Sequence, residues 1–476
     1  MDFFKVKLKE WSPRMIVSVS KENIFKMKKV KIIAVILLIT VSNIILAQDK
    51  TEEVTTVLIT NVKVWDGTAN KTIAADVLIE GDKFKEIKAG IKAPKGATLI
   101  DGKGGTLIPG LIDMHQHLML WGGTTEGTFD YDAYAQGARA KVMSDRLIQM
   151  GYTTVRDIGG NSLSFAKLIQ ENKMDGPRIY SSGPVISQTG GHGDWGPANE
   201  MPGQGNYQTM TANTHVVDGV SEVIKATRWN FRNGANFIKV MAGGGVASTF
   251  DPLNMTQMNA DELKAIVEVA DAMESYVAVH SYHDRSYNAA LDAGVKSFEH
   301  GFLITEPTVK RMSETEGVFW SWQPFGSYTL FAGGFPEWFT ADMREKGTAV
   351  NKGSVVVPPL MRKYGITVVL GSDMFGEEVR FARQNIISAK EVPNTGYTDL
   401  EIMKMATSNC TEILKMSGPG RDPYKAAKLG VVEVGAWADL NIWTQDPTKD
   451  VTVLKSDDNL TLVIKGGKVY KNSLED

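Results

Sequence analysis

The sequence of 476 residues contains a single cysteine, Cys410, and only seven histidines. One cysteine excludes an intramolecular disulfide framework and any metal site built from several thiolates. A metal centre in this chain would therefore need histidine together with oxygen ligands, which are the remaining common donors. The few histidines thus carry most of what the sequence can indicate about a metal.

A surplus of charge of one sign is also missing, since 52 Lys and Arg stand against 55 Asp and Glu. This balance excludes the basic footprint of a nucleic-acid-binding protein. With 43% hydrophobic and 22% charged residues, the composition is that of a globular protein and not of a disordered chain. The length allows a large core and more than one domain.

An apolar run covers residues 32–47 and follows four lysines between residues 26 and 31. A basic region, a short apolar core and a terminal small residue are typical of a secretory signal peptide, here with cleavage after Ala47. The run is short for a membrane span, so a retained anchor is the weaker interpretation. We expect removal of residues 1–47 and export of a periplasmic or secreted protein without stable membrane insertion. Met27 is an alternative start.

Both ends of the remaining chain alternate short β-type runs with Gly and Asp turns. This pattern covers residues 48–108 and 426–476, and one of its predicted strands spans 430–434. The intervening residues 109–425 follow a different pattern. We therefore predict a small composite β-sandwich domain, built from both chain ends, beside a central hydrolase domain.

The middle of the chain alternates strand and helix patterns. The eight predicted strands are 109–117, 153–157, 178–182, 237–241, 277–281, 297–300, 318–323 and 367–373. Strands that alternate with helices in this way predict an α/β fold of the (β/α)8 TIM-barrel type. A doubly wound open sheet is the alternative, but no Gly-rich dinucleotide loop follows the first strand.

Six polar residues fall at or near the carboxyl ends of these predicted strands, where barrel enzymes place their chemistry. They are His115, His117, Lys239, His280, His300 and Asp373. Side chains alternate along a strand, so His115 and His117 point to the same face. An isolated His-x-His pattern is more often packing than metal binding. Four of the seven histidines at one barrel mouth reverse that preference.

Lys239 stands in an apolar strand pattern, where a lysine normally forms a salt bridge or extends its stem along apolar surface. Burial beside cations would lower the pKa of its ammonium group and favour the neutral amine. A neutral amine can take up carbon dioxide and form a carbamate. The residue would then be an anionic ligand with two oxygens instead of a repelling cation.

These strand ends, together with two later segments, carry short motifs. They read PGLIDMHQH at 109–117, FIKV at 237–240, VAVH at 277–280, EHG at 299–301, GSD at 371–373, AWADL at 436–440 and IKGGKV at 464–469. With these motifs the chain resembles the amidohydrolase superfamily of metal-dependent hydrolases, most closely its imidazolonepropionase-like and Xaa-Pro dipeptidase (prolidase)-like branch. The resemblance covers residues 55–472. It implies hydrolysis of a carbon–nitrogen bond and leaves the substrate open.

The resemblance further implies a binuclear site with two divalent metal ions. Zinc suits imidazole and carboxylate donors, while iron, manganese and cobalt stay open. One ion would be held by His115, His117 and Asp373, and the other by His280 and His300. The alternative to His280 as a ligand is His283, which lies three residues further on.

Carboxylated Lys239 and a hydroxide would bridge the two ions in such a site. Asp373 would accept the proton of the attacking water and pass it to the leaving nitrogen. If Lys239 were unmodified, a mononuclear site would be the better interpretation.

Three residues are predicted to contact substrate. His192 has the plainer alternative of an ordinary loop histidine. Arg228 could receive a substrate carboxylate or belong to a solvated helix face, and Gln323 is a candidate polar contact beside aromatic residues that more often pack. Arg156 and Asp157 are expected to pair with each other at the rim of the barrel.

The sequence therefore predicts an exported, metal-dependent amidohydrolase that cleaves the amide bond of a dipeptide or an N-acyl amino acid. Cyclic-amide hydrolysis is the second hypothesis. Deamination of a ring is disfavoured, because superfamily deaminases typically lack the bridging lysine. A catalytically silent barrel that binds a small molecule is the alternative from another class. A homo-oligomer is compatible with the sequence.

Overall fold

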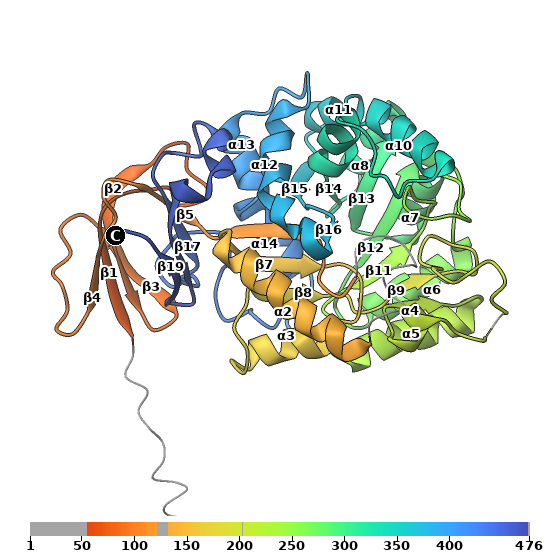
Figure 1. The fold of residues 1–476 in the computed structure, drawn as a ribbon, viewed down its shortest axis with the longest axis horizontal. Coiled ribbons are helices and arrows are strands. Elements are labelled where there is room, and N and C mark those ends of the chain that lie inside the picture. Colours follow the sequence, from red (N-terminus) through yellow and green to blue (C-terminus); the bar gives the residue numbers. More distant parts are fainter. Residues whose placement is uncertain (1–54, 121–131, 202, 475–476) are drawn as a thin grey trace, which may run out of the picture. The chain divides into compact units, whose positions relative to one another are not determined.

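The computed structural model of the protein describes residues 55–120, 132–201, 203–474 (Figure 1). The predicted signal peptide, residues 1–47, lies outside the described residues. From Thr55 to Asp476 the chain forms one compact unit. Among the described residues, no helix combines the length and apolar character needed to cross a membrane.

Strands from both ends of the chain join in one sheet, in the order β19-β18-β17-β5-β1-β2-β3, with β4 paired to β1. The strands are β1 (Thr56–Val64), β2 (Ile73–Glu80), β3 (Lys83–Lys88), β4 (Thr98–Asp101), β5 (Thr106–Pro109), β17 (Leu440–Trp443), β18 (Leu460–Lys465) and β19 (Lys468–Asn472). The two ends meet where β5 pairs antiparallel with β17, opposing Leu107 to Ile442. Both side chains are fully buried in the hydrophobic cluster of this sheet.

The strand predicted at 430–434 is wrong, because these residues form turns and irregular structure. Gly430 and Gly435 both adopt positive φ angles, which end extended backbone on either side. Val432 is buried in the cluster of the terminal sheet but Val434 is 61% exposed, so the apolar alternation does not continue along one buried face.

The central region consists of parallel strands with helices in the connections, which is a TIM-barrel-like α/β arrangement. Its strands are β6 (Leu111–His117), β7 (Tyr152–Asp157), β8 (Arg178–Ser181), β9 (Val185–Ser187), β10 (Thr214–Val216), β11 (Ile238–Met241), β12 (Val277–His283), β13 (Ser297–Leu303), β14 (Phe319–Trp322), β15 (Thr367–Leu370) and β16 (Met374–Phe375). They pair as two arcs, β16-β6-β7-β8 and β10-β9-β11-β12-β13-β14-β15. Short segments, 182–184 and 371–373, connect one arc to the other along the chain.

Helices occupy the connections between these strands (Figure 1). They are α2 (Ala133–Gln149), α3 (Leu163–Gln170), α4 (Tyr207–Met210), α5 (Val220–Arg232), α6 (Ala260–Asp271), α7 (Asp284–Ala293), α8 (Glu306–Ser313), α9 (Leu330–Ala332), α10 (Ala341–Gly353), α11 (Val357–Lys363), α12 (Ala382–Glu391), α13 (Asp399–Met405) and α14 (Ser408–Lys415). Helix α6 illustrates why these segments form helices. Asn259 and Glu262 form a capping box at its start, and Leu263 and Ile266 on its apolar stripe are buried.

Shorter helical turns complete the described structure. They are the π-helical turn η2 (Phe325–Thr329) and the 3-10 turns η3 (Gly376–Phe381), η4 (Val451–Lys455) and η5 (Asp457–Asn459).

The terminal sheet is tied directly to the first barrel strand. Only Gly110 separates β5 from β6, and its backbone N–H donates to the carbonyl of Asp439. A Cβ at position 110 would lie 2.1 Å from Oγ1 of Thr153, so only glycine fits. Arg178 adds a buried ion pair to Asp439, with Nε and Oδ2 2.9 Å apart. Because β5 ends at Pro109, the barrel strand predicted from residue 109 begins at Leu111.

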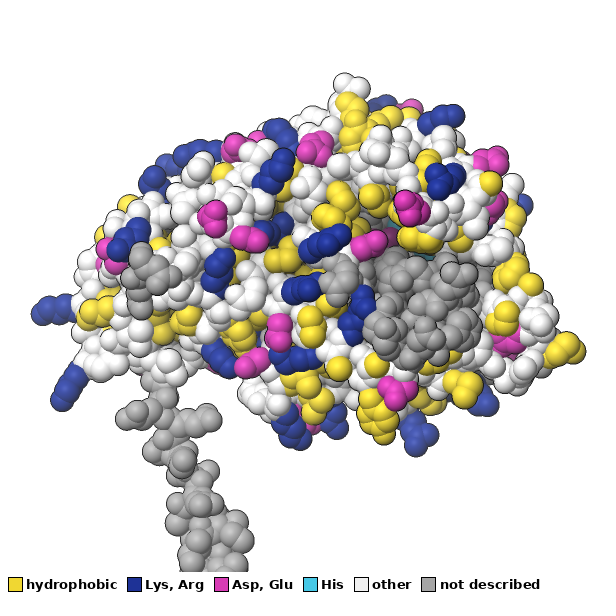
Figure 2. Space-filling view, in the orientation of Figure 1, with side chains coloured by type: hydrophobic (Ala, Val, Ile, Leu, Met, Phe, Trp, Pro, Cys, Tyr) yellow, Lys and Arg dark blue, Asp and Glu magenta, His cyan; other side chains and the backbone are white. Residues whose placement is uncertain are grey.

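The surface shows no area dominated by one charge on the face drawn in Figure 2, where Lys and Arg are interspersed with Asp and Glu. This distribution agrees with the near-balanced composition and gives no basic stripe of the kind that binds nucleic acid.

Candidate active site

One cavity of about 210 Å³ receives the six polar residues predicted at strand ends. His115 and His117 come from β6, Lys239 from β11, His280 from β12, His300 from β13, and Asp373 from the segment between β15 and β16. Parallel strands direct their carboxyl ends to the same side of a barrel, so residues distant in sequence converge there.

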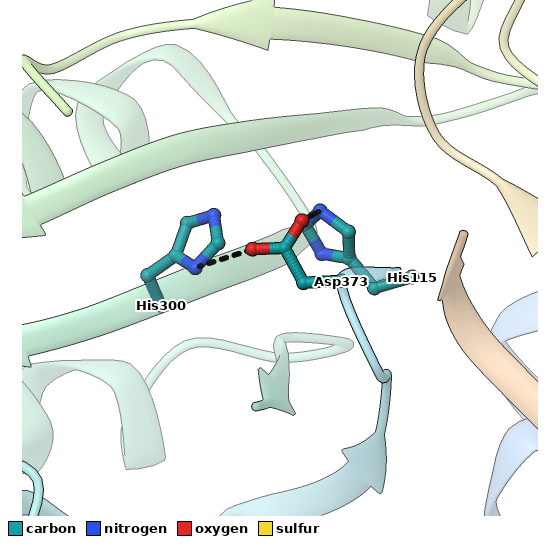
Figure 3. A group of neighbouring side chains, drawn as sticks. All are labelled: His115, His300 and Asp373. Carbon is teal, nitrogen blue, oxygen red and sulfur yellow. Dashed lines mark ion pairs between the residues drawn. The ribbon is translucent and has the colours of Figure 1, made fainter. Parts of the chain in front are cut away.

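Asp373 lies between the histidines of this cavity (Figure 3). Its Oδ1 is 3.4 Å from Nε2 of His115 and 3.2 Å from Nε2 of His117. Its Oδ2 is 4.0 Å from Nδ1 of His300. The side chains of His115, His300 and Asp373 together offer ligand atoms within 4.8 Å of one another. The three residues therefore form a compact donor group of the kind that holds a divalent cation.

Backbone strain accompanies this group. His300 has a φ of 64° and Asp373 a φ of 55°, both in the left-handed region that non-glycine residues seldom occupy. Such conformations cost free energy and persist where the surrounding structure holds them, often at functional sites. Gly371 permits the approach of Asp373 to β6, because a Cβ there would lie 2.2 Å from Cβ of His115.

The protonation of His115 follows from its neighbours. Its Nδ1 lies 2.8 Å from Oε2 of Glu299, and a carboxylate can only accept, so Nδ1 carries the proton. Burial lowers the pKa of His115 to about 4, which keeps the ring neutral near pH 7. Its Nε2 is then a lone-pair donor that faces the carboxylate of Asp373 with no proton between them. Two electron-pair donors in this relation are complementary to a cation.

Glu299 is a residue whose role the sequence reasoning missed. It is fully buried, and its Oε1 lies 2.7 Å from Nη2 of Arg156. Burial is the largest effect and opposes its ionisation, but Arg156, His115 and Lys239 together outweigh burial, and the pKa of Glu299 lies well below its ordinary value. A glutamate directly before His300 in an apolar strand was the available signal, since a buried carboxylate requires a partner.

The predicted pair of Arg156 with Asp157 is wrong. Adjacent residues on β7 point to opposite faces, so the two side chains cannot meet. Arg156 instead binds Glu299 and donates from Nε to the carbonyl of Met114. Burial raises the pKa of Asp157 to about 7.

Lys239 is 1% exposed, and its Nζ has no hydrogen-bond partner among the described residues. Burial lowers the pKa of its ammonium group to about 8, with Arg156 adding to the effect and Glu299 and Asp373 opposing it. The neutral amine is therefore accessible near physiological pH. An orphaned amine that faces a cavity is the state in which a lysine can be carboxylated.

His192 and His280 also line the cavity and stack on each other, with ring centroids 4.0 Å apart. Nδ1 of His192 lies 2.7 Å from Oγ of Ser248, and Nε2 of His280 lies 3.2 Å from the carbonyl of Gly244. His283 is not among the cavity residues, and its Nε2 lies 3.4 Å from the carbonyl of Met255. This placement favours His280 over its alternative.

The other two predicted substrate contacts differ in position. Gln323 lines the cavity, where its Oε1 accepts from the backbone N–H of His300. Arg228 is exposed on α5 and does not line the cavity. Trp320 and Trp322 are fully buried and stack on each other, so these aromatic residues are packing.

The remaining wall of the cavity is largely apolar. Residues between β14 and α11 contribute Leu330, Phe331, Trp338, Phe339 and Val350. Sequence patterns did not place these side chains, because tertiary packing sets the positions of the helices α9 and α10 and of the turns between them. A substrate with an apolar body therefore fits this space.

The chain matches the model of the amidohydrolase family over residues 106–470 and belongs to that family. Ochratoxinase from Aspergillus niger is 32% identical over 388 residues, which cover 77% of this chain and 75% of the relative. A solved prolidase structure complexed with N-methylphosphonate-L-proline superposes with a TM-score of 0.79 at 30% identity, covering 88% of this chain and 100% of that chain. Imidazolonepropionase from Idiomarina loihiensis is 21% identical over 412 residues, covering 79% of this chain and 88% of the relative.

These similarities confirm the resemblance inferred from the motifs, including its imidazolonepropionase-like and prolidase-like branch. They also confirm that the protein is a hydrolase acting on carbon–nitrogen bonds. The family is typically metal-dependent, and the cavity holds a candidate metal site. Membership of this family therefore argues against the alternative that the protein is a catalytically silent barrel.

Proposed function

We propose that the protein is a metal-dependent amidohydrolase that cleaves the amide bond of a dipeptide or an N-acyl amino acid. The observation that carries this proposal is the relation of His115 to Asp373. A neutral imidazole and a carboxylate face each other at 3.4 Å at the base of a substrate-sized cavity. A positive centre satisfies two such electron-pair donors, and the neighbouring histidines extend the set.

The residues fit two divalent metal ions, most suitably Zn²⁺. His115, His117 and Asp373 would hold one ion, and His280 and His300 the other. When bound, the ions supply the acidification of a water molecule and the polarisation of the scissile carbonyl.

Lys239, once carboxylated, would replace a cation in this cavity by two oxygen donors for the metal ions. Its unpartnered Nζ and its lowered pKa support this assignment.

The protein's own side chains then handle the protons. Asp373 is the general base, which accepts a proton from the attacking water and returns it to the leaving nitrogen. Glu299 keeps the proton of His115 on Nδ1, so that Nε2 remains free for the metal. The apolar wall excludes water around the amide, which strengthens the electrostatic interactions inside the cavity.

The same proposal extends to architecture and location. We propose that the two strand arcs belong to one (β/α)8 barrel and that the terminal sheet is a composite β-sandwich domain. The signal-peptide pattern of residues 1–47 supports export. Amino-terminal sequencing of the protein recovered outside the cytoplasm should begin after Ala47, whereas an intact amino terminus inside the cell would contradict export.

The decisive experiment screens purified protein against dipeptides and N-acyl amino acids, with metal analysis on the same sample. We expect stoichiometric divalent metal and turnover of members of this set. The Asp373→Asn variant should lose activity by a factor of about 100 or more, as expected for a general base. Cyclic amides are included in the screen, and exclusive turnover of these would replace the proposal. Absence of divalent metal in an active sample would overturn it.

A further inference from the structure

The cavity contains a second carboxylate besides Asp373, and nothing in the proposed reaction uses it. Glu378 lies five residues after Asp373, on the turn η3 (Gly376–Phe381), and its half-buried side chain lines the cavity. Among the described residues it forms no hydrogen bond and no ion pair. A half-buried carboxylate without a partner costs free energy unless a ligand satisfies it.

The charges near Glu378 do not neutralise it. Burial raises the pKa of Glu378, the charge of Asp373 raises it as well, and only Arg380 lowers it. Arg380 is exposed and its guanidinium lies over the ring of Phe381, 4.7 Å from the ring centroid. No ion pair joins Arg380 to Glu378 in the described structure. The carboxylate is therefore available to a cation that enters from the cavity.

The other residues that line the cavity also favour a positively charged substrate group. Within the described residues, its lining includes one lysine, Lys239, and no arginine. Lys239 lies at the metal-ligand end and is enclosed. The predicted carboxylate receptor, Arg228, is outside the cavity. Apart from the proposed metal ions, an anionic substrate group would thus meet no free permanent cation among the described lining residues, whereas a cationic group would meet Glu378.

Resting on the proposed function, we propose that Glu378 is a specificity-determining residue that binds an organic cation of the substrate. That cation is an alkylammonium or guanidinium group on an apolar body. The apolar residues Leu330, Phe331 and Trp338 line the same cavity and would cover the carbon skeleton. Low local dielectric strengthens the charge-assisted hydrogen bond between the cation and the carboxylate. The substrate class is thereby narrowed to amides that carry a positive charge.

Two sources of the cation are distinguished by matched substrate pairs. Phenylalanyl-leucine against its N-acetyl derivative tests the free α-ammonium group. N-acetyl-leucyl-lysine against N-acetyl-leucyl-norleucine tests a basic side chain. For one pair, we expect wild-type kcat/KM to favour the cationic member by roughly tenfold or more, the usual effect of one charge-assisted hydrogen bond.

The Glu378→Gln variant should reduce that ratio to near unity, because glutamine keeps the shape and loses the charge. Glu378→Ala provides a second variant, and circular dichroism checks the fold of both. The matched control is Glu268→Gln, on the exposed face of α6, which should retain the wild-type ratio. Equal cleavage within both pairs by the wild type, or a ratio that survives in both Glu378 variants, would overturn the inference.

A binding measurement separates this inference from the proposed function. Benzylamine and benzyl alcohol share a body, but only benzylamine is a cation at about pH 7.5. Calorimetry on the metal-loaded protein should show tighter binding of benzylamine, and Glu378→Gln should remove the difference. If no amide is cleaved but this difference is present, the amidohydrolase proposal fails and the cation site stands. If amides are cleaved and the difference is absent, the cation site fails alone.

Discussion

Arg156 and Glu299 form a fully buried ion pair, with Nη2 and Oε1 2.7 Å apart, and Glu299 passes this constraint to His115 through its second oxygen. The link joins β7, β13 and β6 below the cavity. Removing one partner of a buried pair leaves an uncompensated charge, so the link matters for stability as well as for the orientation of His115.

Glu299→Gln should weaken metal binding by a factor of about 10 to 100, because the partner that orients a ligating histidine is altered. It should also destabilise the fold by about 3 kcal/mol, since Arg156 loses its counter-charge. Competition with a chelator and urea unfolding measure the two effects. The control is Ser297→Ala, which removes the hydroxyl that accepts from Arg156 and donates to Oε1 of Glu299, and leaves the carboxylate and its contact with His115 in place. Unchanged metal affinity in Glu299→Gln would contradict the role assigned to Glu299.

The junction between the terminal sheet and the barrel gives a second prediction. Gly110→Ala should destabilise the protein by about 1–3 kcal/mol, because the new Cβ overlaps the side chain of Thr153. Gly137→Ala is the matched control on α2, where a Cβ meets nothing within 4 Å. There the change should stabilise by about 0.5–1 kcal/mol through helix propensity. Thermal unfolding compares the two, and equal effects would show that the close approach at Gly110 is relaxed in solution.

How much the sequence could predict depended on the periodicity of each element. His115 and His117 were placed correctly on one strand face because the strand period is two, and the ends of parallel strands brought Lys239 and Asp373 to the same cavity. Side-chain contacts between residues that are distant in sequence leave no periodic pattern that could predict them. Arg156 was assigned to its neighbour Asp157, whereas its true partner lies 143 residues away.

The sequence also could not show which residues outside the barrel strands face the cavity. Arg228 was a candidate because it precedes a barrel strand, but the position of a residue around α5 decides whether it faces the cavity, and Arg228 is exposed. Glu378 and Trp338 stand in connections whose direction is set by tertiary packing. No local pattern therefore pointed to them.

The buried histidines predict how stability depends on pH in the metal-free protein. The pKa of His115 falls from 6.5 to about 4 on burial, and those of His280 and His300 are also lowered by burial. Between these values the unfolded chain binds more protons at these three rings than the folded one, so their contribution to stability rises with pH. This contribution is complete above about pH 6.5 and is lost progressively toward about pH 4, while the raised pKa of Asp157 contributes in the opposite direction.

Urea unfolding of chelator-treated protein at several pH values measures this slope. His115→Gln removes one of the titrating groups and should reduce it. Equal slopes in the wild type and in His115→Gln would show that the pKa of His115 is not lowered in the folded state.

Replacement of Lys239 should have opposite effects on activity and on stability. It should remove turnover but stabilise the metal-free fold. The Nζ of Lys239 is buried and has no hydrogen-bond partner within the described part of the chain, so Lys239→Met should increase the free energy of unfolding by about 1–3 kcal/mol while abolishing turnover. The folded-state pKa of about 8 lies below the ordinary value of 10.5, so the unfolded chain holds more protons in that interval. Stability of the wild type should therefore rise from about pH 8 to 10.5, and the methionine variant should lack the rise.

The matched control for this variant is Lys264→Met, at an exposed position of α6, which should change stability by no more than about 0.5 kcal/mol. Unfolding in metal-free buffers purged of carbon dioxide keeps the amine unmodified during the measurement. Adding bicarbonate should leave the stability of Lys239→Met unchanged, because a methionine side chain cannot form a carbamate. If Lys239→Met were as destabilising as the loss of a buried ion-pair partner, Lys239 would be a charged structural residue, and the carbamate assignment would fall.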